Sequence, residues 1–165
     1  MDSPYEKRPW LKIYPDWMPV DLEVPQVTAR DDFENSAALR PDKPAIYYFD
    51  HIISYGELNA LANGLAAALT DKGIKKGGRI MVVLQNIPQF MIALYGSWKV
   101  GAIVVPLNPM YKEKELTYFC QDSGARAIIL LNTAAQELDL GFLKETPIYY
   151  FQCPGLSILS PNDNG

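Results

Sequence analysis

The segment Ile87–Pro109, IPQFMIALYGSWKVGAIVVPLNP, decides the fold, because it suits either a membrane-spanning helix or a buried helix followed by a strand. A spanning helix needs about 20 consecutive apolar residues. Lys99 and Gly101 interrupt this run, and its composition then changes to the β-branched sequence Ile103–Val105. Such a change across a glycine is typical of a buried helix that leads into a buried strand. We therefore interpret the segment as part of a folded core and not as a membrane span.

Helical and strand patterns alternate around this segment. We expect strands without polar alternation at Ile80–Leu84, Ile103–Val105 and Ala127–Leu131. Between the last two, Lys112–Asp122 has helical spacing and Gly124 ends the helix. The residues of this helix that we expect to face inward are Leu116, Phe119 and Cys120. Unalternated strands joined by helices predict an α/β fold, in which βαβαβ crossovers build a parallel sheet covered on both faces.

The C-terminal region continues this alternation less clearly. A weaker helix is expected at Thr133–Lys144 and a fourth strand at Ile148–Phe151. Residues 157–165 have the composition of an open loop, at which we expect the α/β unit to be truncated. We therefore divide the chain into an arm at residues 1–25, an α/β subdomain at residues 26–156 and that final loop.

The clearest local signal is a helix start at Ser54. Ser54 and Glu57 are spaced as a capping box, in which each side chain accepts a hydrogen bond from the backbone N–H of the other residue. Apolar residues then repeat with helical spacing and predict one buried stripe, made of Leu58, Leu61, Ala62, Leu65 and Leu69. Gly73 follows Lys72 at the position where a glycine ends many helices. These features predict a helix at Tyr55–Lys72.

Before this helix we expect a shorter helix and a β-hairpin. The helix covers about Asp31–Leu39 and ends before Pro41, because a residue that precedes proline avoids the α conformation. The residues that we expect on its inward side are Phe33, Ala37 and Leu39. The hairpin pairs Ala45–Phe49 with Ile52–Ile53 across a turn at residues 50 and 51. His51, the single histidine, is expected to be exposed and not catalytic, since no partner that would orient it is visible.

The first 25 residues are rich in proline and in aromatic residues. Prolines at this density exclude a helix interior or a central strand, so we expect an extended arm. These prolines are Pro4, Pro9, Pro15, Pro19 and Pro25. The large aromatic residues between them are Tyr5, Trp10, Tyr14 and Trp17. They are too many for a free tail, and we expect them to lie over another surface, either of this chain or of a partner.

Composition and charge exclude several classes of protein. The 165 residues are 48% hydrophobic and 21% charged with a net charge of −4, which argues against disorder and against nucleic-acid binding. We interpret the basic segment Lys72–Arg79 as a solvated turn. Cys120 and Cys153 have no CxxC spacing and no histidine cluster, so we expect reduced cysteines and no metal site. The polar N-terminus lacks a secretory signal, which favours a cytoplasmic location, with peripheral attachment to a membrane as an addition.

An asparagine follows each of the three predicted parallel strands. Ligands of open parallel sheets bind outside the carboxyl ends of the strands, so Asn86, Asn108 and Asn132 are candidate cofactor-binding residues. The competing interpretation is that they cap helix N-termini, a position that asparagine favours. The chain has no GxGxxG, GxxxxGK[ST] or GxSxG motif, and we therefore predict no catalytic residue and no complete phosphate site.

Several segments can be compared together with a known family. Four of them are Ile53–Leu58, Asn86–Phe90, Trp98–Pro109, and Glu115-Leu116 followed by Asp122–Arg126. Arg40–Ala45 and the proline- and tryptophan-rich start at residues 8–17 add to them. In this order and with this spacing, they resemble the opening part of the adenylate-forming enzymes, and most closely the long-chain fatty-acid:CoA ligases.

The resemblance implies a two-step reaction that uses ATP, Mg²⁺ and CoA. In such enzymes a fatty carboxylate attacks the α-phosphate of ATP, and CoA then displaces AMP from the acyl-adenylate. The family's phosphate loop, magnesium carboxylate and catalytic lysine lie downstream of the part represented here. We therefore expect an N-terminal subdomain of such a ligase, which provides scaffold, binds none of these cofactors tightly alone and self-associates through an exposed core face.

Two other classes of function remain open. The chain could be a separate α/β module that uses Asn86, Asn108 and Asn132 around a small ligand. It could also be a non-catalytic interaction protein that docks on a partner through the aromatic arm.

Overall fold

The computed structural model describes residues 5–138, 148–151 and 158–159. Its helices are α1 (Ala29–Leu39), α2 (Tyr55–Asp71), α3 (Pro88–Lys99), α4 (Glu113–Ser123), α5 (Asn132–Glu137) and the 3₁₀ helix η1 (Pro9–Ile13). Its strands are β1 (Pro44–Tyr48), β2 (His51–Ser54), β3 (Arg79–Val83), β4 (Ile103–Pro106), β5 (Ala127–Leu131), β6 (Ile148–Phe151) and β7 (Ile158–Leu159). The predicted α/β architecture is confirmed.

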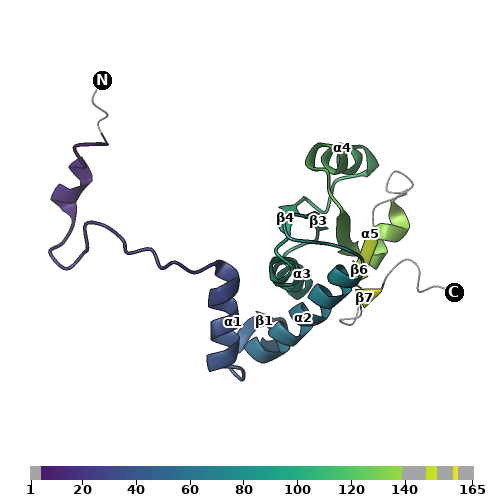
Figure 1. The fold of residues 1–165 in the computed structure, drawn as a ribbon, viewed down its shortest axis with the longest axis horizontal. Helices are drawn as coiled ribbons and strands as arrows, with labels where there is room; N and C mark the ends of the chain where they lie inside the picture. The colour runs from purple at the N-terminus through teal and green to yellow at the C-terminus, as the bar shows by residue number, and fades with distance from the viewer. Residues whose placement is uncertain (1–4, 139–147, 152–157, 160–165) are drawn as a thin grey trace.

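The main sheet has the strand order β4-β3-β5-β6-β7. The first four strands are parallel and β7 is antiparallel to β6. Strand β3 is the first of them in the chain, yet it lies between β4 and β5. In Figure 1 helix α4 lies above this sheet and helices α2 and α3 lie below it. The sheet is therefore the middle layer of a three-layer sandwich, as the unalternated strands predict.

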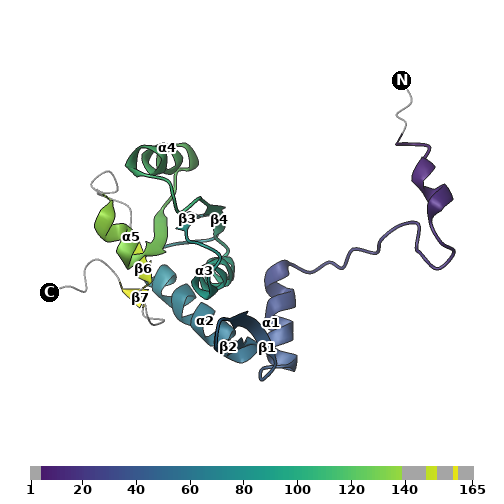
Figure 2. The ribbon, with the colours of Figure 1, turned by 180° about the vertical axis from the view of Figure 1, so that it is seen from behind.

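The lower face of the sheet carries the larger apolar cluster. Side chains of α1, α2 and α3 pack there against alternate residues of β3 and β5, including Ile80, Val82 and Ile129. Helices α2 and α3 approach closely, because Gly96 faces Leu65: a Cβ atom at Gly96 would lie 2.8 Å from the nearest Leu65 atom. Figure 2 shows α1 and the hairpin beside the first half of α2. Helix α1 and the hairpin therefore extend the helical layer on this side of the sheet.

The upper face is covered by α4 and α5. Leu116 of α4 is fully buried against Met81 and Ile128, the residues of β3 and β5 that point to this side. Half-buried side chains surround these residues, among them Phe119 and Cys120. The inward residues predicted for α4 are thus confirmed.

The structure confirms the features predicted for helix α2. The Ser54 hydroxyl accepts a hydrogen bond from the Glu57 backbone N–H at 3.2 Å, and the Glu57 carboxylate accepts one from the Ser54 N–H at 2.8 Å. The predicted stripe is buried, apart from the half-buried Leu61. Gly73 has the expected positive φ of 80° just past the helix.

Helix α1 begins two residues earlier than predicted. Thr28 and Asp31 form a second capping box, which the prediction missed. Phe33 and Ala37 are buried as expected, but Leu39 is 80% exposed, so its predicted inward position is wrong. With about 3.6 residues per turn, Leu39 lies on the opposite side of the helix from Ala37.

The segment that decides the fold forms α3, a turn and β4. Gly101 makes the turn with a φ of 72°. Lys99, the charge that argues against a membrane span, forms an ion pair with Glu34 of α1 and lies 5.8 Å above the Phe33 ring. Among the described residues, no helix is long and apolar enough to span a membrane.

The hairpin turn differs by one residue from its prediction. Tyr48 pairs with His51, so the two-residue turn is Phe49–Asp50 and His51 belongs to β2. Phe49 has a φ of 49°, a conformation that is uncommon for aromatic residues and that no sequence rule would assign to it. His51 is exposed, as predicted.

The arm projects away from the other described elements in Figure 1. It is not extended throughout, because η1 begins at Pro9 within it. Trp17 is 79% exposed, and Tyr5, at 74%, packs its ring against Trp10 of the same arm. The aromatic residues of the arm therefore do not lie over the chain's own core.

Two corrections concern the C-terminal region. Helix α5 ends at Glu137, whereas a helix to residue 144 was expected; residues 139–147 and Cys153 lie outside the described residues. Strand β6 has the predicted bounds. Ile158 and Leu159, which were expected in an open loop, pair with β6 as β7.

Candidate functional site

The candidate site is the edge of the sheet where the parallel strands end. Because β4, β3 and β5 are adjacent and parallel, the loops that carry Asn108, Asn86 and Asn132 leave from the same edge. The chain passes from β3 to β4 in one direction across the sheet and from β5 to β6 in the other. The strand order therefore reverses between β3 and β5. Ligands of open α/β sheets bind in the crevice at such a switch point.

Asn86 and Asn132 flank this switch point, and Asn108 lies one strand away. Asn86 is exposed, and its side chain has no hydrogen bond among the described residues. Its amide can therefore donate to a ligand and accept from one. The N-cap of α3 is Ile87, without a side-chain hydrogen bond, so the capping interpretation is wrong for Asn86.

The other two asparagines use their side-chain oxygens locally. Asn108 Oδ1 accepts from the Met110 N–H at 2.9 Å, which stabilises the turn after β4. Asn132 Oδ1 accepts from the Thr133 N–H at 2.9 Å, and Asn132 is the first residue of α5, not its N-cap. Neither caps a helix as the capping interpretation requires. Each keeps its amide NH₂ group as a donor for a ligand.

The edge offers neutral polar groups and no acid–base pair. Among the described residues, no group of three His, Cys, Asp or Glu side chains could hold a metal ion. Mg²⁺ prefers carboxylates, and a triphosphate needs a glycine-rich cradle or cations. Residues 85–88, 107–111 and 131–133 contain no carboxylate, cation or glycine. These loops therefore do not fit Mg²⁺ or the phosphates of ATP by themselves, and suit uncharged parts of a ligand.

The titratable groups with shifted pKa values lie elsewhere. Hydrogen bonds from Arg30 and then Thr28 hold the pKa of Asp31 far below its usual range. Hydrogen bonds from Ser54 lower the pKa of Glu57. Burial, followed by the charge of Tyr55, raises the pKa of Tyr95. The two carboxyl shifts belong to helix caps, and none of these groups is in the asparagine loops.

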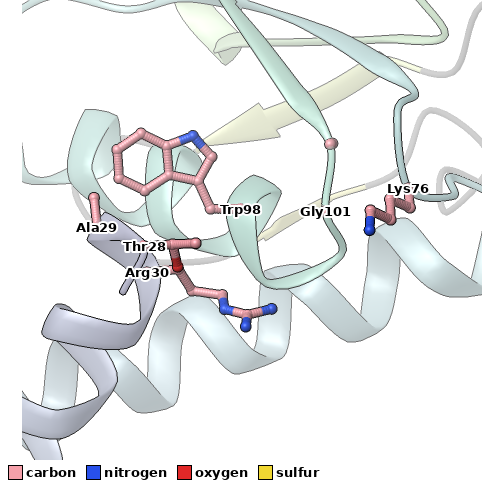
Figure 3. A pocket seen from close by; sticks show the side chains of 7 residues that line it. Thr28, Ala29, Arg30, Lys76, Trp98 and Gly101 are labelled. Atoms are coloured by element: carbon pink, nitrogen blue, oxygen red, sulfur yellow. The ribbon is translucent and has the colours of Figure 1, made fainter. Parts of the chain in front are cut away.

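A cavity of about 360 Å³ lies at the opposite edge of the sheet (Figure 3). Its lining comes from the start of α1, the end of α3 and the turns before β3 and β4; the residues are Thr28, Ala29, Arg30, Lys76, Trp98, Gly101 and Ala102. Arg30 is paired with Asp31 and Glu34, so its charge is already neutralised. This cavity is separate from the asparagine loops. The sequence did not indicate it, because its lining residues come from three segments that are distant in the chain.

Comparison with known proteins assigns the fold to a family. The family model described as "AMP-binding enzyme" matches residues 33–152. A long-chain-fatty-acid–CoA ligase of Bacillus subtilis is 39% identical over 126 residues, which are 76% of this chain and 22% of that protein. Surfactin synthase subunit 1 of the same organism is 38% identical over 114 residues, 68% of this chain and 3% of that protein.

A solved structure agrees with these relatives. The N-terminal domain of FACL13 from Mycobacterium tuberculosis superposes with a TM-score of 0.60 at 31% identity, covering 65% of this chain and 28% of that one. The chain thus spans less than a quarter of the length of the curated ligase that it matches. The family model covers well over half of the chain, and the chain belongs to the AMP-binding enzyme family.

Proposed function

We propose that this chain forms the N-terminal part of an ATP-dependent fatty-acid:CoA ligase of lipid metabolism. The observation that carries the proposal is its similarity to the Bacillus subtilis ligase across most of the chain. In the proposed reaction, a fatty carboxylate attacks the α-phosphate of ATP in the presence of Mg²⁺ and releases pyrophosphate. The thiol of CoA then attacks the acyl-adenylate and releases AMP.

The part that we propose for this chain is scaffold and one wall of the ligand crevice. The loops at the switch point supply amide groups and no carboxylate or cation. We therefore expect the phosphates, Mg²⁺ and the catalytic groups to be held by other parts of the complete enzyme. We infer a cytoplasmic location with peripheral contact to a membrane.

The chain alone is expected to be inactive. Fatty-acid-dependent exchange of pyrophosphate into ATP should be absent for residues 1–165. Thermal-shift measurements with ATP, CoA and oleate should give no strong stabilisation, whereas a separate ligand-binding module would be stabilised by its ligand. Exchange by the purified chain, or a large shift with one ligand, would contradict the proposal.

A chimera tests the proposed function directly. Residues 33–152 of this chain would replace the matching segment of the Bacillus subtilis ligase, and exchange would be measured with a panel of fatty acids and amino acids. The panel is needed because a peptide synthase is also among the relatives. We expect exchange with fatty acids. A folded chimera that is active only with amino acids would overturn the fatty-acid assignment.

Two asparagine variants in this chimera test the crevice. Asn86→Ala removes an amide that is free to bind a ligand, and loss of one such hydrogen bond should lower the apparent kcat/KM about fivefold to tenfold. Asn108→Ala is the matched control, one strand away from the switch point, and should change kcat/KM less than twofold. Equal effects of the two variants would contradict the proposal that the ligand binds at the switch point.

A further inference from the structure

The amino edge of the parallel sheet, opposite the asparagine loops, carries cations that have no carboxylate partner. Lys75 and Lys76 lie in the turn before β3, Arg79 begins β3 and Arg126 precedes β5. All four are exposed. None of them has an ion pair among the described residues.

The two arginines are immediate neighbours on adjacent strands. The Arg126 N–H donates to the Arg79 carbonyl at 2.7 Å, and the pairing continues with Ile80 beside Ala127. Both side chains share the α4 side of the sheet, because side chains alternate along a strand and Met81 and Ile128 belong to the cluster under α4. Like charges in adjacent positions of a sheet are destabilising. An anion placed between them would relieve this repulsion.

Among the described residues, no ion pair accounts for these four charges. Lys72, by contrast, caps the C-terminal end of α2, where the helix dipole favours a cation. The aliphatic stem of Lys76 lies close to Gly101: a Cβ atom at Gly101 would lie 3.0 Å from Lys76 Cγ. Between residues 72 and 79 there is no acidic residue.

Apolar surface borders the cations. Ile103 is the register partner of Arg79 on β4 and is 49% exposed. Ile103, Arg79 and Arg126 thus form one row across three strands. The half-buried Trp98 and Lys76 both line the cavity, with Gly101 between them in Figure 3. Cations next to an exposed aliphatic group such as Ile103 are suited to a membrane interface, where both kinds of group are stabilised.

We propose that this basic edge, defined as Lys75, Lys76, Arg79 and Arg126, docks the protein on a bilayer of anionic phospholipid. The surface is open and spread over a turn and the starts of two strands, which suits many phosphate groups in a plane better than one small anion in a cavity. The docking deepens the peripheral location proposed above by naming the surface. It leaves the asparagine loops, at the opposite edge, free of the membrane.

Sedimentation with vesicles tests this docking. The chain would be mixed with vesicles of phosphatidylcholine containing phosphatidylglycerol, and with vesicles of phosphatidylcholine alone. Binding should occur with the anionic vesicles only. It should be reversed by about 0.5 M salt, because salt at that concentration screens the attraction between the cations and the lipid phosphates. Each cation near an anionic surface contributes about fivefold in affinity, so Lys75→Gln with Lys76→Gln should weaken binding about 30-fold.

The matched control is Lys112→Gln with Lys114→Gln. This pair removes the same charge from exposed positions at the start of α4, near the opposite edge, and should weaken binding less than threefold. Arg79→Gln with Arg126→Gln is a second edge variant, expected to match the lysine pair. Unchanged circular dichroism and melting temperature would exclude unfolding, and two edge variants keep the test valid if one of them does not fold.

Three results would overturn the proposal. If the wild-type chain does not bind, or binds neutral vesicles equally well, anionic lipid is not its partner. An equal loss in the control pair would show a general effect of net charge. Light scattering is measured in parallel: if the edge variants abolish self-association and leave vesicle binding unchanged, the edge binds an acidic segment of a second copy. None of these results involves catalysis, so the fatty-acid assignment stands or falls separately on the chimera.

Discussion

The two faces of the main sheet differ in how well they are packed. Of the described residues, thirteen are buried in the cluster shared by β3, β5 and helices α1 to α3, and six in the cluster under α4 and α5. Half-buried side chains border both clusters, but the larger cluster also includes the close approach of α2 and α3 at Gly96. The face below the sheet therefore carries most of the stability, and the face above it has more freedom to relax.

Replacing one buried leucine on each face tests this difference most strongly. Leu65→Ala should lower the free energy of unfolding by about 4 kcal/mol, because α2 and α3 cannot close around the cavity. Leu116→Ala removes the same atoms from a fully buried position on the other face, and should cost only about 2.5 kcal/mol since its half-buried neighbours can move inward. Urea-induced unfolding measures both values. Equal losses would contradict the comparison.

Two helical glycines give the next largest difference. Gly96→Ala should destabilise the protein by about 1–2 kcal/mol, because the new methyl group overlaps Leu65 and outweighs the gain in helix propensity. Gly64→Ala is the control in α2, where nothing lies within 4 Å of the new atom; it should stabilise by about 0.5–1 kcal/mol. Thermal unfolding of both variants measures the difference. A stabilising Gly96→Ala would show that the helices can separate at little cost.

Helix caps on the two faces should respond in opposite directions. Ser54→Ala removes the cap of α2 and should cost about 1 kcal/mol. The N-cap residue of α4, Lys112, makes no side-chain cap hydrogen bond, although Glu115 already accepts the Lys112 N–H. Lys112→Ser would complete a capping box there and should stabilise by about 0.5 kcal/mol. Chemical denaturation checks both values, and a neutral Ser54→Ala would show that α2 needs no cap.

The smallest predicted effect is a pH dependence at the α2 cap. Hydrogen bonds from Ser54 lower the pKa of Glu57 in the folded state, so its ionised form adds stability above the ordinary glutamate pKa. This stability is lost as the pH falls through that value toward the lowered one. The difference in unfolding free energy between wild type and Glu57→Gln should therefore shrink between pH 6 and pH 3. A constant difference over this range would place the effect in packing instead.

Most elements could be predicted from the sequence, because their signals are local. Strand β5 has the predicted bounds, and the capping box at Ser54 with the leucine stripe placed α2 to within one residue at its end. The errors came where local signals were weak or misapplied. Leu39 was assigned inward although its spacing excludes it, and the hairpin turn lies at Phe49, which lacks the usual turn chemistry.

The candidate site was predicted only in part. The position of asparagines after parallel strands indicated the edge, and the three loops do meet there by topology. The strand order could not be predicted from the sequence. Without it, no sequence feature distinguishes Asn86 and Asn132 at the switch point from Asn108 beside it. Their proposed role in ligand binding remains a prediction.

By itself, the sequence determined where helices and strands form, because spacing, caps and glycines act between residues a few positions apart. The run Ile87–Pro109 contains all the information needed for α3, the Gly101 turn and β4. Only the tertiary structure decided that β3 lies between β4 and β5, since strand pairing joins residues more than 20 positions apart. That pairing sets Arg79 beside Arg126 and separates the basic edge from the asparagine loops.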